Sequence, residues 1–183
     1  MTSTTTTSNT STISTSAFPA ITPPTVQEEF FFEPLLDAIG RGDDVAVTHI
    51  IDIGGFSADL SETDANGFTC LHWAASSRES ERLLPTLLAQ GAHVEATNKF
   101  GQTPLHLCCA QGRLYAVTCL LHKGANPNPQ TTDTLSTPLH LAVQHDHEDI
   151  SRLLLAFGAD TSIVNAAGET AFDLGLAALL GGS

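Results

Sequence analysis

The chain has 183 residues, a length that fits one domain, and its hydrophobic content of 42% is enough for a folded core. Twenty acidic side chains against seven lysines and arginines give a formal charge of −13. A surface with this charge repels phosphate groups, which argues against nucleic acid and anionic membrane surfaces as direct partners. Basic or neutral protein segments are the partners that the charge favours.

Four cysteines, Cys70, Cys108, Cys109 and Cys119, form no CxxC motif and no disulfide framework. We therefore expect buried free thiols that pack as small apolar side chains, and not a zinc site. Free thiols indicate a reducing compartment. The sequence also lacks an apolar run of about 20 residues and a basic N-terminal signal, so an intracellular protein of the cytoplasm or nucleus is predicted.

Residues 1–27 are rich in serine and threonine and contain no charged side chain. Such a segment buries too little apolar surface to offset its chain entropy, so it is predicted to be a disordered tail before a domain at 28–183. Two interpretations remain open for the tail. It is either a platform for phosphorylation or glycosylation, or a solvated leader with no site.

Phe30, Phe31 and Phe32 follow this tail directly. Three aromatic side chains in water would be costly, so we expect them to cover the N-terminal end of the domain core. A docking motif for another protein is the alternative, because exposed aromatic clusters mark interaction sites.

Two markers recur along the domain at one interval. The segment 101–107 reads Gly-Gln-Thr-Pro-Leu-His-Leu, and altered copies place its histidine at His72, His106 and His140, each 34 residues apart. A Gly-Ala pair recurs at 91, 124 and 158 in the same register. A period of this length indicates a protein built from stacked repeats.

The predicted units span 33–63, 64–97, 98–131, 132–164 and a partial fifth at 165–183. Each is expected to form a helix, a tight turn, a second helix that ends at glycine, and an extended loop. The first unit departs from the pattern, with Glu33 and Leu36 in place of threonine and histidine. The fifth has Asp173 at the histidine position, which suits a closing half-unit.

Two further departures predict local irregularities. Pro85 falls inside the expected second helix of the second unit, where proline removes a backbone bond, so a late start or a kink is predicted. Leu135 stands where Gly67, Gly101 and Gly168 stand in other units. Because leucine adopts a positive φ only at a cost, a distorted turn is predicted there.

The Thr-Pro-Leu-His pattern resembles the ankyrin repeat family, over roughly residues 29–180. The resemblance implies an all-α solenoid of stacked helix-turn-helix units with short β-turn fingers. Threonine would cap each first helix, and proline would follow at the first helical position. In this family the histidine bonds the threonine and the backbone of adjoining loops.

The regular histidines also suggest a metal or catalytic site. Neighbouring units lie about 10 Å apart, however, whereas zinc needs nitrogens at about 2 Å from one point. A second cluster, at 145–149, is expected on a turn between helices, with adventitious metal binding as the alternative. The sequence has no phosphate loop, nucleophile elbow or HExxH motif, so no catalytic residue, cofactor or resident metal is expected.

The resemblance implies a protein partner, bound through the finger tips and the exposed, concave face of the first helices. Phe68 and Phe100 are candidate anchors, with packing inside their own fingers as the alternative. Trp73 is assigned to the core. The candidate protein-binding residues are Asn66, Phe68, Ser76, Ser77, Arg78, Lys99, Phe100, Gln102, Gln111, Asp133, Thr134, Ser136, Gln144 and His145.

The predicted function is that of a non-catalytic, monomeric adaptor, scaffold or inhibitor. A regulatory subunit or fragment of a larger enzyme is the first alternative. A small enzyme using histidine and cysteine is the second, and it would need the two side chains within hydrogen-bond reach.

Overall fold

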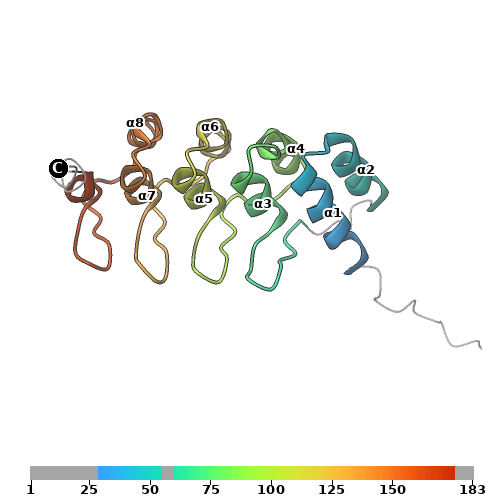
Figure 1. The fold of residues 1–183 in the computed structure, drawn as a ribbon, viewed down its shortest axis with the longest axis horizontal. Coiled ribbons are helices and arrows are strands. Elements are labelled where there is room, and N and C mark those ends of the chain that lie inside the picture. The colour runs from blue at the N-terminus through green and yellow to red at the C-terminus, as the bar shows by residue number, and fades with distance from the viewer. Residues whose placement is uncertain (1–28, 55–59, 176–183) are drawn as a thin grey trace, which may run out of the picture.

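The computed structural model describes residues 29–54 and 60–175, with side chains described for 33–52 and 60–175. The predicted Ser/Thr-rich tail and the apolar segment after Gly175 lie outside this range. Figure 1 shows paired helices arranged in two rows, with loops projecting from one side like fingers. The helices are α1 (Glu29–Arg41), α2 (Asp44–Gly54), α3 (Cys70–Ser76), α4 (Leu84–Ala89), α5 (Pro104–Ala110), α6 (Leu114–His122), α7 (Pro138–Gln144) and α8 (Glu148–Ala156).

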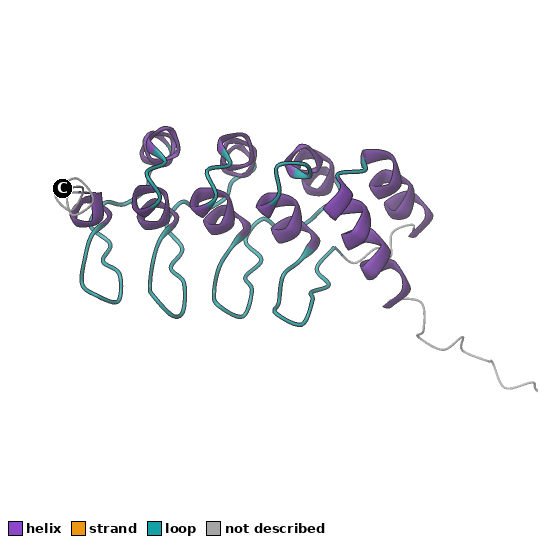
Figure 2. Ribbon diagram, in the orientation of Figure 1, coloured by secondary structure: helices purple, strands orange, loops and turns teal. Residues whose placement is uncertain are grey.

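Within the described residues there is no strand, only an isolated bridge between Val164 and Thr170 (Figure 2). A last helical turn covers 171–175. The prediction of an all-α solenoid with short turn-like fingers is confirmed.

The first helices of the three middle units begin in the same way. Thr69, Thr103 and Thr137 precede α3, α5 and α7 with extended backbone, as helix caps do. Proline occupies the first position of α5 and α7, where its missing N–H group leaves no bond unmade. The sequence pattern therefore fixes where each of these helices starts.

Packing follows the same repeat. The first helices contact one another in series, α1 with α3, α3 with α5 and α5 with α7, and the buried side chains form one continuous core from Leu35 to Ala171. Leu71, Leu105 and Leu139 are buried in it. Cys70, Cys108 and Cys109 are buried thiols, and Cys119 is a partly buried one. All four cysteines were expected to be buried, and this is confirmed for Cys70, Cys108 and Cys109 but not for Cys119.

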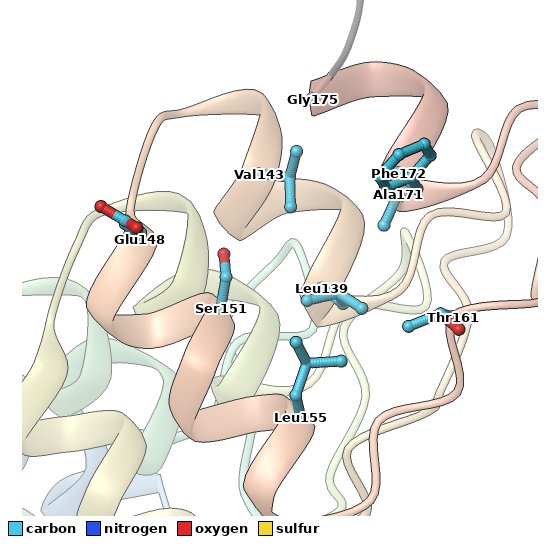
Figure 3. A pocket seen from close by; sticks show the side chains of 9 residues that line it. All are labelled: Leu139, Val143, Glu148, Ser151, Leu155, Thr161, Ala171, Phe172 and Gly175. Atoms are coloured by element: carbon cyan, nitrogen blue, oxygen red, sulfur yellow. The ribbon is translucent and has the colours of Figure 1, made fainter.

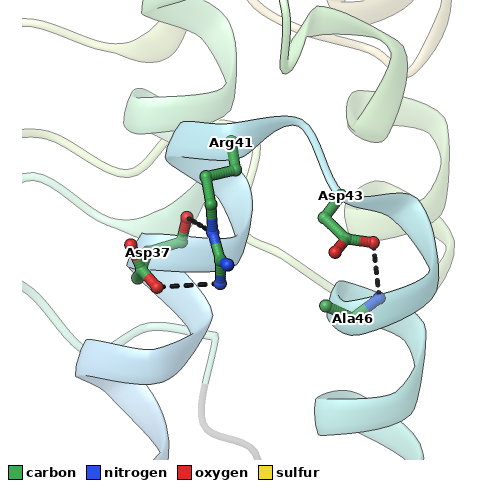
Figure 4. Close-up of polar contacts among 4 residues, drawn as sticks. All are labelled: Asp37, Arg41, Asp43 and Ala46. Atoms are coloured by element: carbon green, nitrogen blue, oxygen red, sulfur yellow. Dashed lines mark hydrogen bonds and ion pairs between the residues drawn. The ribbon is translucent and has the colours of Figure 1, made fainter.

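The first unit has its own helix signals. α1 begins at Glu29, so Glu33 and Pro34 lie inside the helix instead of at its start. Arg41 pairs with Asp37 at 2.8 Å on the surface, an exposed contact that contributes little to stability (Figure 4). The carboxylate of Asp43 accepts a hydrogen bond from the Ala46 N–H at 3.0 Å and so caps α2, a contribution of about 1 kcal/mol. The roles suggested for the three phenylalanines stay predictions, because their side chains lie outside the described set.

The second helix of the second unit starts late, as Pro85 predicts. A 3₁₀ turn at Glu81–Leu83 comes first, and α4 begins only at Leu84, which puts Pro85 in its first turn. Proline is tolerated there because the first N–H groups of a helix have no intrahelical partner.

The Leu135 turn differs from the prediction in one respect. Leu135 keeps the positive φ of the glycines at the same position, with φ of 50° against 70° for Gly101. The distortion is an increase in loop length. The backbone hydrogen bond that closes this finger runs from the Thr131 N–H to the Ser136 carbonyl, whereas the one that closes the previous finger runs from Asn98 to Gln102. The turn thus contains one extra residue, and the predicted departure from the regular turn is confirmed in that form.

Replacing Leu135 by glycine should raise the thermal midpoint, because it removes the cost of about 1–2 kcal/mol that a left-handed backbone imposes on leucine. The gain is reduced by about 0.5–1 kcal/mol through the greater freedom of glycine in the unfolded chain. Calorimetry of the full chain measures both effects together.

The matched change is Gly101→Ala, which should lower the midpoint. Its new Cβ would lie 2.8 Å from the Thr132 backbone nitrogen, at a positive φ. Equal shifts in the two variants would contradict this account of the turns.

Candidate protein interface

Each finger is a small hydrogen-bonded loop. In the second and third units, Asp64 and Asn98 accept bonds through Oδ1 from two backbone N–H groups further along their own loop, at 2.8–2.9 Å. Asn165 repeats this arrangement in the last finger. In the fourth unit Thr131 takes the role, its hydroxyl accepting from the Ser136 N–H at 3.1 Å.

The fingers are also tied to one another at their tips. The N–H of Lys99 donates to the Asn66 carbonyl and that of Thr132 to the Phe100 carbonyl, each at 3.0 Å. Ala166 repeats the contact to Thr134 at 2.8 Å. One backbone bond per junction holds the row of fingers in Figure 1 together, so the fingers present a surface of fixed shape.

The repeated histidine links each unit to the next. His106 accepts the Thr103 N–H at Nδ1 (3.0 Å), and its Nε2 lies 3.1 Å from the Ser136 carbonyl, 30 residues further on. His72 and His140 make equivalent bonds to the carbonyls of Gln102 and Glu169, at 3.0 and 3.1 Å. The structural role that the resemblance implied for these histidines is confirmed.

This geometry fixes the protonation of the ring. Because a backbone N–H can only donate, Nδ1 of His106 must accept, and the single ring proton sits on Nε2 facing the carbonyl. Burial lowers the pKa of His106 to about 4, and it lowers the pKa of His72 in the same direction. His72 and His106 are therefore neutral at physiological pH.

The core thiols are equally inert. Burial raises the pKa of Cys108 and of Cys109, which keeps both in the neutral thiol form. Within the described residues, no group of three or more His, Cys, Asp or Glu side chains is arranged to hold a metal ion.

Residues 145–147 of the cluster at 145–149 lie on the turn between α7 and α8, as predicted, and Glu148 and Asp149 belong to the first turn of α8. Asp146 has a φ of 58°, the conformation that Gly112 adopts one unit earlier. The His147 ring lies over Gly112, and its Nε2 is 3.3 Å from the Ala110 carbonyl. The cluster thus bridges two units.

The predicted binding residues fall on the fingers and at the ends of the first helices. Among them, Phe100 is a large apolar side chain with 46% of its surface exposed. Ser76, Ser77, Phe68 and Gln102 are partly buried. The exposed members of the set are Asn66, Arg78, Lys99, Phe100, Gln111, Asp133, Thr134, Gln144 and His145.

Two of the predictions need correction. Ser136 is buried, at 6% exposure, so it presents no side chain to a partner. Its backbone carbonyl closes the fourth finger and accepts from His106. Trp73 is not a core residue: it is 42% exposed, on α3. Its ring lies 6.2 Å from that of Phe68, which also packs edge-on against His72.

Trp73 therefore belongs to the candidate interface, and the prediction from sequence missed it. Its ring lies near that of Phe68 on the second finger. Phe68 supports it from the finger, which favours local packing over anchoring for Phe68 itself.

The chain belongs to the ankyrin repeat family. The family's profile of three consecutive ankyrin repeats matches residues 35–131 and 79–165. Domains of this family are generally protein-interaction modules. No helix among the described residues is long and apolar enough to cross a membrane.

Similar curated proteins are larger. The chain is 34% identical over 129 residues to human Rabankyrin-5, covering 57% of this chain and 11% of the relative. It is 34% identical over 142 residues to human SH3 and multiple ankyrin repeat domains protein 2, covering 77% and 8%. Human ankyrin repeat and SOCS box protein 16 is 31% identical over 158 residues, covering 85% and 32%. The chain thus spans about a tenth of the first two relatives.

Acidification should weaken the stack through His106. Its pKa is about 4 in the folded chain against an ordinary 6.5. Between these two pH values the unfolded chain protonates His106 and the folded chain does not, so protons favour the unfolded state. The free energy of unfolding should decline between pH 6.5 and 4, by up to about 3 kcal/mol from this group.

Urea titrations at several pH values measure this decline. A His106→Asn variant should be less stable at pH 7 yet show a shallower decline, since the titrating group is gone. A slope unchanged by the substitution would contradict the assignment.

Proposed function

We propose that the chain is a non-catalytic protein-binding module whose binding surface is the face shared by the fingers and the first helices. The observation that carries the proposal is the pair of exposed aromatic side chains on this face, Trp73 on α3 and Phe100 on the third finger. Large aromatic side chains contribute disproportionately to binding at protein interfaces.

The rigidity of the face supports the same function. Backbone hydrogen bonds join the tips of neighbouring fingers. Buried histidines of the first helices bond to carbonyls of the fingers that follow. A surface that is already ordered loses little conformational entropy when a partner binds. The chemistry of the interior fits a non-catalytic role, because its histidines are committed to backbone bonds and its buried thiols are neutral.

The partner that we propose is a protein segment bound by a monomeric domain. The acidic surface disfavours nucleic acid. Four cysteines that form no disulfide suit a reducing, intracellular compartment, in the cytoplasm or nucleus.

Phe100→Ala and Trp73→Ala should each reduce capture of the partner by about 30-fold or more, the effect of losing about 2 kcal/mol of binding energy. The thermal midpoint should move little, since both side chains are substantially exposed. Quantitative mass spectrometry of proteins retained by the immobilised full chain measures the loss.

Tyr115→Ala is the matched control. Tyr115 is an aromatic of similar exposure, 49%, and lies on α6 in the row of second helices. It should leave capture unchanged. Equal losses for all three variants, or none, would contradict the assignment of the face.

A further inference from the structure

A groove lies open at the C-terminal end of the described stack. It encloses about 510 Å³ between α7, α8 and the helical turn at 171–175. Figure 3 shows Leu139 and Val143 of α7 between Leu155 of α8 and Phe172 on the opposite side. The lining is almost entirely apolar, and Phe172 is 73% exposed.

The repeat register identifies what kind of element fits the groove. Leu155 is the counterpart of Leu121, 34 residues earlier, which is only 4% exposed because the next unit covers it. Leu155 is 47% exposed. The groove is thus the position that the second helix of a following unit occupies elsewhere in the stack, as α8 does beside α6.

The charge around the groove indicates the character of its occupant. Residues 133–175 contain seven acidic side chains and one basic one, Arg152. Glu148 lies at the edge of the groove, where its carboxylate pairs with Arg152, and Asp173 is the exposed neighbour of Phe172. Opposite charge on a partner steers association to such a site and fixes its orientation.

We infer that the groove docks an amphipathic helix from a partner protein, with apolar side chains on one face and lysine or arginine on its flanks. About nine residues suffice, the length of both α6 and α8. Apolar anchors spaced i, i+3 or i+4, and i+7 would fill the space between Leu155 and Phe172. This surface is separate from the fingers, so it adds a second interface to the proposed function.

Fluorescence anisotropy with the full chain tests the inference. The probe is a labelled twelve-residue peptide with a leucine face and lysine flanks. Two matched peptides carry the same leucine face with glutamate flanks, or the same composition in scrambled order. The lysine-flanked peptide should bind at least about tenfold more tightly than either, with an affinity that falls as salt rises.

Single substitutions test whether the peptide binds in the groove. Leu155→Glu should weaken binding of the lysine-flanked peptide at least about tenfold. Val45→Glu, at an apolar side chain 79% exposed on α2, and Phe100→Ala on the fingers should have no effect. Glu148→Lys should weaken the lysine-flanked peptide and tighten the glutamate-flanked one, a reversal that a folding defect would not produce.

Other results would overturn the inference. Equal binding of the three peptides, or indifference to Leu155→Glu, would show that the groove recognises no helix. Binding that appears only after removal of residues 176–183 would make this chain's own segment the occupant. A dimer in sedimentation that Leu155→Glu converts to monomer would make the occupant a second copy. Loss of capture through Phe100→Ala tests the finger surface independently.

Discussion

The stack depends on a neutral imidazole that bonds in two directions. In each middle unit Nδ1 accepts from the threonine backbone that starts its own helix, and Nε2 faces a carbonyl in the next finger. One side chain thus orders a helix start and joins it to the next unit. Because the ring is buried, the alternative to these bonds is an unsatisfied polar group in the core, which is costly.

The fingers inherit their order from this junction. The carbonyls that receive the histidines, at Gln102, Ser136 and Glu169, are the same ones that close the finger loops. The outward side of each finger is therefore free for variable residues while its inner side is fixed. That division explains how one framework displays Lys99 and Phe100 in one unit and Asp133 and Thr134 in the next.

Much of the fold could be predicted from sequence because every unit repeats the same local signals and contacts mainly its neighbours. Thr103 and Pro104 mark a helix start without reference to the rest of the chain, and Pro85 marks a delayed one. Exposure was harder to predict. Trp73 looks like a core residue by its chemistry, yet its place one residue after the histidine turns it toward the finger. Ser136 looks like a surface residue, but only 6% of it is exposed.

Asp173 determines how well a further repeat could join the C-terminal end of this array. Its carboxylate accepts hydrogen bonds from the backbone N–H and the hydroxyl of Thr170, at 2.9 and 2.6 Å. It thus reproduces the contact of the histidine Nδ1 with threonine, but not the contact of Nε2 with the next unit. Ionised, it has no proton to offer a carbonyl beyond it, whereas an imidazole does. A further repeat fused here would place its carbonyl against this carboxylate, which is electrostatically unfavourable. Asp173→His would supply the proton donor that the junction needs.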